Sequence, residues 1–213
     1  MKTLTIMRHG KANTGATDAA SYDQLADMGK EQSALAGAYL RGSGKYSRVI
    51  CGTLQRHSET VEHAAMAMPL KQDARLNELP YFELGQAVVN RLGLSFPDDD
   101  ESFTAFFTAI LSNWDAWALE LGIPSREAVL HDVIDLLHEQ SEDTLIVSSG
   151  GILELLGSHA LGLTPEMTTR FVTPIAHTSI HRFRLHEDRL VLEKYCAIPH
   201  LDRDDQRHLV TFA

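Results

Sequence analysis

A strand that ends in small residues and leads directly into a helix is the feature that most restricts the fold of this chain. Residues 143–156 read DTLIVSSGGILELL, in which an apolar and β-branched run reaches Ser148 and a helical pattern begins after Gly151. Such a turn exposes the backbone N–H groups of the first helical turn, and these groups attract an anion. We therefore expect an anion-binding turn between a buried strand and a helix.

Short strand-forming runs and helical patterns alternate along most of the chain. The expected strands are 3–7, 48–51, 70–72 and 145–148, followed by a late pair at 179–185 and 190–196. The expected helices are 27–40, 53–68, 103–121, 125–140 and 151–161. This alternation implies a three-layer α/β/α fold, in which helices cover both faces of a mostly parallel central sheet. Ligands bind such sheets where loops leave the carboxyl ends of the strands.

Polar residues that can accept hydrogen bonds from free N–H groups precede three of these helices. Asp27, Thr53 and Ser125 are the expected N-cap residues. The helix after Thr53 is expected to run to about Met68, because Pro69 then interrupts the helical pattern.

The length of 213 residues suits a single domain that spans 1–213. Residues from about 79 to 123 interrupt the alternation and are predicted to form a small helical cap inserted beside the sheet. An aromatic face from Phe103 to Leu121 follows the helical period there. This face could pack on the sheet or form a homodimer interface, and both uses stay open. The acidic run at 98–101 is interpreted as a solvated loop that leads into the helix.

The charge and the cysteine content narrow the class of protein. A formal net charge of −10 argues against nucleic acid or an anionic membrane as a partner. Two cysteines, Cys51 and Cys196, cannot support a disulfide framework, which favours a reducing compartment. The opening MKTLTIMRHG lacks the apolar run of a signal peptide, and no apolar segment approaches the ~20 residues needed to span a bilayer. We therefore expect a cytoplasmic protein.

The residues that can take part in binding or catalysis follow three of the expected strands, and a parallel sheet would bring them to one edge. The first strand ends in Arg8, His9 and Gly10, and the second leads to Arg56 in the first turn of a helix. Gly10 lets the backbone approach a ligand closely. Two guanidinium groups and two helix N-termini that converge are suited to a dianionic phosphoryl group. The sequence therefore predicts a site for a phosphate ester.

His9 would lie at the centre of this site. A neutral imidazole can attack phosphorus directly and form a phosphoenzyme. The leaving oxygen then needs a proton, for which Glu78 in ARLNELPYFELG is the expected acid and Glu83 the second choice. Lys11 and Asn13 follow the histidine closely, and either line the phosphate mouth or are simply exposed.

These residues resemble the motifs of the histidine phosphatase superfamily, also called the phosphoglycerate mutase-like family. The resemblance covers most of the chain and is weakest between about 85 and 125. Three segments carry it: RHG at 8–10, CGTLQRHSET at 51–60 and RLNE at 75–78. Their order along the chain agrees with the alternation of strands and helices.

The resemblance implies a three-layer α/β fold and a phosphohistidine on His9, with Arg8 and Arg56 clamping the phosphoryl oxygens. Glu78 would act as general acid and then as base for water. This mechanism needs no metal ion or cofactor. We therefore expect a phosphatase that acts on a phosphorylated small molecule or a phosphoprotein, including one that carries phosphohistidine. A mutase is the nearest alternative, and a phosphate-binding or regulatory protein with weak catalysis is an alternative of another class.

The turn at Ser149 departs from the family pattern. The family has Ser-His-Gly-Gly there, and its histidine contacts the phosphoryl group, whereas this chain has Ser149 in that place. The helix start at Gly150 still offers backbone donors, but a hydroxyl supplies no positive charge. We expect His177, with His200 as the alternative, to restore the missing donor. Two more histidines are expected to lie partly exposed on the second helix: His57 and His63.

Overall fold

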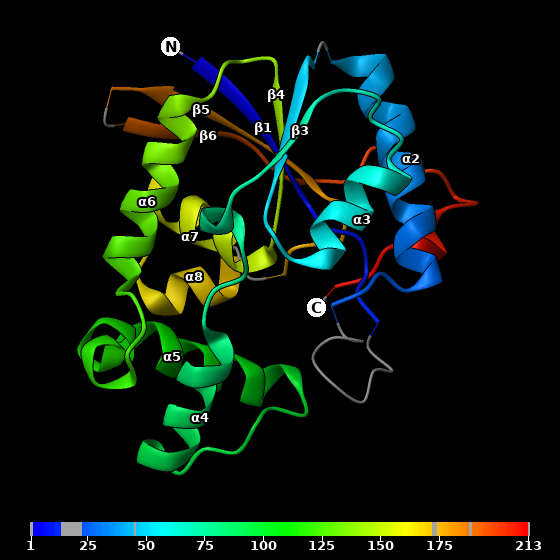
Figure 1. Cartoon of the computed structure of the whole chain (residues 1–213). Helices are drawn as coiled ribbons and strands as arrows, with labels where there is room; N and C mark the ends of the chain where they lie inside the picture. The colour runs from blue at the N-terminus through cyan, green and yellow to red at the C-terminus, as the bar shows by residue number, and fades with distance from the viewer. Residues whose placement is uncertain (1, 14–22, 45, 172–173, 188, 213) are drawn as a thin grey trace.

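A six-stranded sheet forms the centre of the part of the chain that the computed structural model describes, which is residues 2–13, 23–44, 46–171, 174–187 and 189–212. The strands lie in the order β3-β2-β4-β1-β5-β6 (Figure 1). Their bounds are β1 Lys2–Arg8, β2 Arg48–Cys51, β3 Leu70–Gln72, β4 Thr144–Ser148, β5 Ile180–His186 and β6 Arg189–Ala197. Strands β1 to β4 are parallel, whereas β5 is antiparallel to both β1 and β6. The predicted mostly parallel sheet is confirmed.

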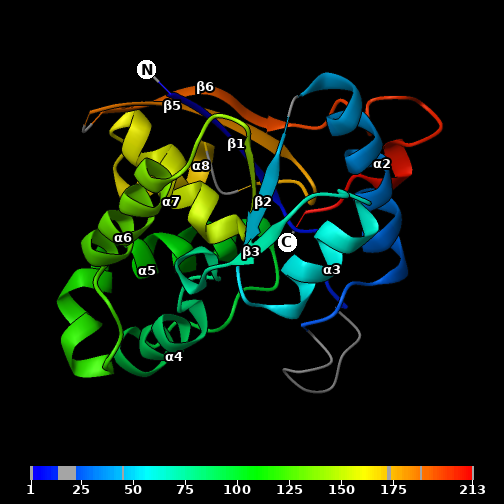
Figure 2. The same ribbon diagram turned by 45° about the horizontal axis from the view of Figure 1, so that its top comes forward.

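Helices cover both faces of this sheet, as the alternation predicted. Their bounds are α2 Asp27–Ser43, α3 Gln55–His63, α4 Tyr81–Leu92, α5 Asp100–Leu121, α6 Arg126–Glu139, α7 Gly150–Leu161 and α8 Pro165–Phe171, with the 3-10 turns η1 Ala74–Leu76 and η2 Arg207–Leu209. Helices α2 and α3 lie on one side of the sheet, and α6 and α7 lie on the other. Figure 2 shows the same division, with α4 and α5 together beyond one end of the sheet.

Alternate residues of the central strands face the two helical layers. Ile6 and Ile146 are buried with residues of α5, α6 and α7. Met7, Leu145 and Val147 are buried with residues of α2 and α3. Successive side chains of a strand point to opposite faces, so a strand that is covered on both faces needs apolar residues at every position. This explains why apolar residues are adjacent at 145–147 of β4 and at 6–7 of β1.

Strands β1, β4 and β2 end next to one another. Arg8 at the end of β1 is in register with Ser148 of β4, and Cys51 at the end of β2 is in register with Val147. His9 donates its backbone N–H to the Ser148 carbonyl at 2.9 Å, which continues the pairing past the strand. The residues that follow these strands therefore lie at one edge of the sheet.

Two helix starts differ from the prediction. Asp27 is the first residue of α2, and the cap position belongs to Ala26, which has no side-chain hydrogen bond to offer. Helix α3 begins at Gln55 and is not capped by Thr53. The Thr53 hydroxyl instead accepts a hydrogen bond from Asn77 Nδ2 at 2.7 Å, which ties the second strand exit to the segment after β3.

The second helix is also shorter than predicted. Helix α3 ends at His63 and does not reach Met68. Ala65 has a φ of 50°, in the left-handed region, and a residue in that conformation cannot continue a right-handed helix. Helix α4 lies within the segment predicted to be a helical cap, although its bounds were not predicted, and α8 was not predicted.

Two other predicted helix entries are confirmed. The acidic run at 98–101 leads into α5, and Asp99 is the N-cap because its carboxylate accepts the N–H of Ser102 at 2.7 Å. The hydroxyl of Ser125 likewise accepts the N–H of Ala128 at the start of α6. These side chains replace helical partners that the first N–H groups lack.

The aromatic face of α5 packs in the core. Phe106, Ile110 and Trp114 are buried in the cluster that also contains the sheet residues Leu4 and Ile146. A homodimer that uses this helix stays a prediction, as do the bounds of a cap. None of the described helices is both long and apolar enough to cross a membrane.

Candidate active site

Two hydrogen bonds fix the orientation of His9 at the edge of the sheet. Its Nδ1 lies 2.7 Å from the carbonyl oxygen of Gly10, and Arg56 donates its Nε–H to His9 Nε2 at 3.3 Å. Because a carbonyl can only accept, the ring hydrogen is on Nδ1 and Nε2 carries a lone pair. Burial, followed by the charge of Arg8 and the neighbouring basic groups, holds the pKa of His9 well below its usual value. His9 is therefore a neutral imidazole.

The side chain of Arg8 crosses the start of α7. A Cβ atom at Gly150 would lie 3.3 Å from Arg8 Nε, so the guanidinium packs directly on the backbone of this glycine. Arg8 Nη1 also donates a hydrogen bond to the carbonyl of Ile175. A guanidinium at a helix N-terminus concentrates positive potential where the N–H groups are free.

Arg56, in the first turn of α3, reaches His9 on one side and an acid on the other. Its Nη1 lies 2.6 Å from Asp23 Oδ1. This ion pair orients the guanidinium next to the imidazole. Sequence reasoning missed Asp23, because it lies before α2 and outside every motif and period that the sequence offers.

Glu78 lies over the N-terminus of α7. Its Oε1 accepts the backbone N–H groups of Gly151 at 3.1 Å and of Leu79 at 3.0 Å. A Cβ atom at Gly151 would lie 2.5 Å from this oxygen, so a side chain there would displace the carboxylate. Glu83 is exposed on the first turn of α4. Of the two predicted acids, Glu78 is the one beside the strand exits.

A cavity of about 850 Å³ opens next to Arg8 and Glu78. Residues of the strand exits, α4, α5, α7 and α8 line it, together with the loop before α5 and Phe212 near the end of the chain. The volume is in the range that holds small-molecule ligands. The carboxyl ends of the strands and the helices beyond them thus enclose one binding space.

Glu154 is a second carboxyl group in this cavity, and sequence reasoning missed it. Its side chain is buried, and the Tyr81 hydroxyl donates to its Oε2 at 2.9 Å. Burial raises the pKa of Glu154 to about 7. Its position in the apolar pattern of α7 gave no signal of this role. In the described part of the chain, no three or more His, Cys, Asp and Glu side chains are grouped so as to hold a metal ion.

The sequence as a whole matches one known family. The match is to the histidine phosphatase superfamily (branch 1) and extends over residues 4–197. The chain belongs to this superfamily. A search of curated proteins found no match.

Solved structures with a similar fold include three at 18–19% identity. One is a phosphoserine phosphatase mutant from Entamoeba histolytica in complex with phosphoserine, with a TM-score of 0.66, 18% identity and coverage of 94% of this chain and 100% of that chain. Another is a mycobacterial glucosyl-3-phosphoglycerate phosphatase with VO3, with a TM-score of 0.62, 19% identity and coverage of 92% and 100%. A third is Bacillus stearothermophilus YhfR, with a TM-score of 0.61, 18% identity and coverage of 94% and 99%. At these identities the likeness shows the shared fold.

Ser149 has an imidazole next to it, supplied by α3. His57 Nε2 lies 2.8 Å from Ser149 Oγ, and the ring centroids of His57 and His9 are 5.5 Å apart. The prediction that His57 is partly exposed is wrong, because its side chain is 0% exposed. Burial lowers the pKa of His57 to about 3, so the ring is neutral.

Gly52 provides the space for this imidazole. A Cβ atom at Gly52 would lie 2.1 Å from His57 Nδ1 and 2.7 Å from Asn77 Oδ1. The sequence signal was the glycine at the strand exit together with a histidine directly after Arg56. It was overlooked because a histidine on a helix is more often exposed than buried at a site.

The two histidines that were expected to replace the missing donor lie in different places. The ring of His177 is buried, with its centroid 5.8 Å from that of His9 and its Nδ1 2.9 Å from Thr211 Oγ1. Burial lowers the pKa of His177 to about 3. His200 Nε2 instead lies 2.9 Å from Thr178 Oγ1, away from the His9 ring nitrogens. His9 is therefore flanked by His57 and His177.

The last two predicted binding residues differ in what they contact. Gly10 donates its N–H to Thr60 Oγ1 at 3.0 Å, and a Cβ atom there would lie 2.5 Å from the Gly29 carbonyl oxygen. Gly10 therefore permits a close helix approach. Asn13 is partly exposed and donates its backbone N–H to the Gln24 carbonyl, so its contribution to the phosphate mouth stays a prediction.

Proposed function

We propose that the protein is a phosphatase that hydrolyses a phosphate monoester through a phosphohistidine on His9. The observation that carries this proposal is the state of the His9 ring. Its Nδ1–H is held by the Gly10 carbonyl, and its Nε2 lone pair faces Arg56. A neutral, oriented imidazole next to guanidinium groups is what nucleophilic attack on phosphorus requires.

The cradle for the phosphoryl group is formed by several positive or donating groups. Arg8 and Arg56 supply the charge, and the free N–H groups at the start of α7 supply backbone donors. His57 is proposed to donate its Nε2–H to Ser149 Oγ, which directs the serine hydroxyl hydrogen toward a phosphoryl oxygen. The serine and the histidine together would thus replace one imidazole donor.

The first chemical step forms a bond between His9 Nε2 and phosphorus while the bond from phosphorus to the ester oxygen breaks. Glu78 would give a proton to that oxygen, so that the product leaves as an alcohol. Its Oε1 accepts two backbone N–H groups, which leaves Oε2 to carry the proton. In the second step Glu78 would take a proton from water, the water oxygen would attack phosphorus, and the bond to Nε2 would break to release inorganic phosphate.

Rapid quenching during turnover of 4-nitrophenyl phosphate tests this proposal. We expect a burst of 4-nitrophenolate and an acid-labile, alkali-stable phosphoryl group on the peptide that contains His9. His9→Gln should abolish both, whereas His63→Gln at the end of α3 should retain both. Turnover without any phosphohistidine would contradict the mechanism.

A phosphate-binding or regulatory protein is a second candidate, and the ion pair of Arg56 favours it. Asp23 occupies one side of the guanidinium at 2.6 Å and so competes with a phosphoryl group for it. Such a protein would bind phosphate or vanadate, as detected by calorimetry, yet release no alcohol from any phosphomonoester. The Asp23→Asn variant separates the two candidates further, because it should strengthen anion binding in both but raise turnover only in an enzyme.

A further inference from the structure

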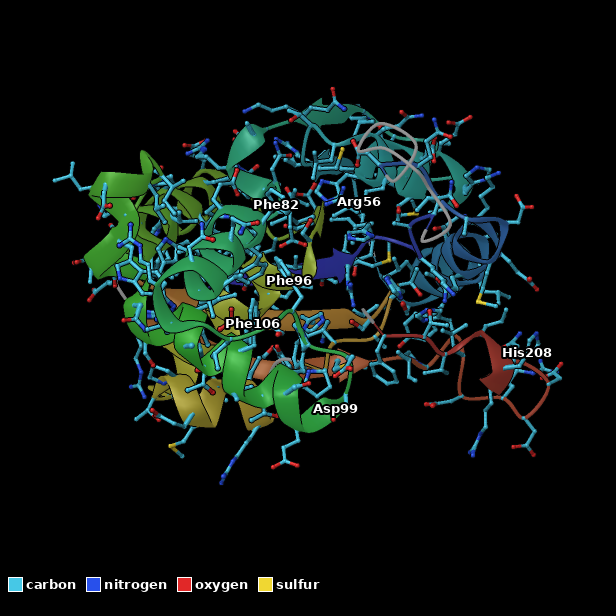
Figure 3. All side chains as sticks on the ribbon, turned by 90° about the horizontal axis from the view of Figure 1, so that it is seen from below. Arg56, Phe82, Phe96, Asp99, Phe106 and His208 are labelled. Atoms are coloured by element: carbon cyan, nitrogen blue, oxygen red, sulfur yellow. The ribbon has the colours of Figure 1, made fainter. Side chains whose placement is uncertain are left out.

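The cavity next to the phosphoryl site is rich in aromatic side chains. Phe96, Phe103, Phe106, Phe107 and Phe212 all line it. The rings form pairs, with centroids 5.3 Å apart for Phe96 and Phe106 and 5.4 Å apart for the stacked Phe103 and Phe107. Figure 3 shows Phe96 and Phe106 next to each other. Such a lining offers favourable contacts to an apolar or aromatic group.

Three of these phenylalanines are largely open to solvent. Phe96 is 52% exposed, Phe103 is 39% exposed and Phe212 is 54% exposed. An exposed apolar patch of this kind, rimmed by polar residues, is typical of a ligand-binding groove. The three rings come from the loop before α5, from α5 itself and from the end of the chain, and they converge on one cavity.

The charges in the cavity have one dominant sign. Arg8 is the only basic side chain among the described residues that line it. The acidic lining residues are Glu78, Asp98, Asp99 and Glu154. The phosphoryl group would take up the charge of Arg8. A second anionic group on the ligand would then face these carboxyl groups, and no second basic side chain among the described residues lines the cavity.

The buried carboxyl of Glu154 also awaits a polar partner. Its Oε1 accepts no hydrogen bond from a described residue, and its ion pair with Arg126 Nη2 is long, at 3.7 Å. The side chain is only 2% exposed, so an unsatisfied oxygen there is costly. A hydroxyl or ammonium group of a ligand would supply the missing hydrogen.

We propose that the substrate is a phosphate monoester of a small alcohol that is apolar or aromatic, carries no further negative charge and bears a hydroxyl or ammonium group for Glu154. This proposal rests on the proposed phosphatase function, and the cavity residues extend it to the alcohol part of the substrate. Esters of carboxylated alcohols, such as 3-phosphoglycerate and phosphoserine, are expected to be poor substrates.

A matched pair of esters tests the charge rule. 2-Phenylethyl phosphate and 2-(4-carboxyphenyl)ethyl phosphate have similar leaving groups and differ by one carboxylate. We expect kcat/KM to be at least about 100-fold higher for the uncharged ester. Asp98→Lys places a cation at the exposed rim and should reduce this ratio by about tenfold or more. Equal kcat/KM values for the two esters would overturn the proposal, as would a preference for a phosphohistidine-bearing protein.

Binding of non-hydrolysable phosphonates separates this proposal from the phosphatase function. We expect 3-phenylpropylphosphonate to bind more tightly than its para-carboxylated analogue by calorimetry, whether or not any ester is turned over. Tighter binding without turnover would support the ligand class and contradict the phosphatase. Turnover without this preference would support the phosphatase and contradict the ligand class. Failure of both phosphonates to bind would also overturn the ligand class.

Two aromatic variants test the location. The double variant Phe96→Ala, Phe103→Ala should lower kcat/KM for 2-phenylethyl phosphate about tenfold more than for ethyl phosphate. Both rings are partly exposed, so the fold should tolerate their loss. Phe82→Ala is the matched control, because Phe82 is 74% exposed on α4 and does not line the cavity. Phe82→Ala should change kcat/KM equally for the two esters. If the double variant also lowers kcat/KM equally for the two esters, the assignment is refuted. Glu154→Gln should lower kcat/KM only for esters that carry a hydroxyl or ammonium group.

Discussion

Moving the second imidazole to position 149, where the family resemblance predicts a histidine, is the most direct test of the role of His57. The perturbation is the pair of substitutions His57→Ala and Ser149→His, made singly and together. In the protein, the imidazole on α3 and the serine at the start of α7 share a hydrogen bond of 2.8 Å, and both side chains are fully buried. The double variant would place the imidazole on α7 and leave space for it on α3.

The expected magnitudes follow from these contacts. His57→Ala removes the partner of a buried serine hydroxyl, which is expected to cost about 1–3 kcal/mol of stability and about 10²–10³ in kcat. Ser149→His alone forces two rings into a space in which Oγ is already 2.8 Å from His57 Nε2, so overpacking should cost about 1–3 kcal/mol. In the double variant the second change fills the space left by the first. The two effects should therefore be far from additive.

The assay is steady-state turnover of 4-nitrophenyl phosphate, with urea unfolding measured on each variant. We expect kcat of the double variant to recover to within about tenfold of the parent, which is about 1.4 kcal/mol of activation free energy. KM should change less than kcat, because Arg8 and Arg56 still bind the phosphoryl group. His177→Ala is the comparison variant, and its smaller expected effect reflects the bond that its Nδ1 already makes to Thr211.

Two results would refute this reasoning. If His57→Ala retains parental kcat, the His57–Ser149 pair takes no part in the reaction. If Ser149→His is well folded and as active with His57 present as without it, the two imidazoles do not compete for one place. His57→Gln guards against a folding artefact, because an amide can keep the bond to Ser149 and should retain stability while losing less kcat than the alanine variant.

Three further predictions concern the acid, the glycines and the pH dependence. Glu78→Gln should lower kcat for 2-phenylethyl phosphate by about 10²–10³. It should affect the burst phase with 4-nitrophenyl phosphate far less, because nitrophenolate leaves without a proton. The control Glu83→Gln changes an exposed residue and should match the parent in both assays. Gly52→Ala puts a Cβ 2.1 Å from His57 Nδ1 and should lower both thermal stability and kcat, whereas Gly42→Ala, with no atom within 4 Å, should raise stability by about 0.5–1 kcal/mol. The folded-state pKa of His57, about 3, lies below its ordinary value of 6.5, so its contribution to stability is complete above pH 6.5 and is lost as the pH falls. Between pH 7 and pH 5 the parent should therefore lose about 2 kcal/mol more unfolding free energy in urea than His57→Gln, in which the other buried histidines are unchanged. Equal losses in the two proteins would contradict the buried, neutral state of His57.

The sheet was predictable because the apolar residues of the central strands indicate that these strands are buried. β4 is apolar at 145–147 and β1 at Leu4, Ile6 and Met7, and the alternation with helices then favours a parallel sheet. Helix ends were less predictable, since they depend on distant contacts. The Thr53 hydroxyl binds Asn77 and so does not cap α3, and a left-handed Ala65 ends the helix before Pro69 is reached. The local sequence indicates neither the partner of Thr53 nor the left-handed conformation of Ala65.

The predicted site residues were those that lie directly at strand exits. His9 and Arg56 follow β1 and β2 closely, so topology alone brings them together. His57 and Glu154 were missed because their roles depend on burial, which raises or lowers a pKa only after packing has excluded water. A histidine or glutamate in a helix has the same sequence appearance whether it faces solvent or a cavity. Asp23 was missed because it lies before α2, outside every motif, and its contact with Arg56 is made only in the folded chain.

The opposite charges of the two halves of the site bear on the choice between hydrolysis and transfer. In the proposed mechanism Arg8 and Arg56 would hold the phosphoryl end, whereas Glu78, Asp98 and Glu154 line the cavity proposed for the alcohol. A mutase must keep its dephosphorylated partner bound until the phosphoryl group returns, and the phosphoglycerate type of partner is an anion. Acidic walls would expel such an anion after the first step. Water is then the acceptor that remains, and the polarity of the site favours a phosphatase.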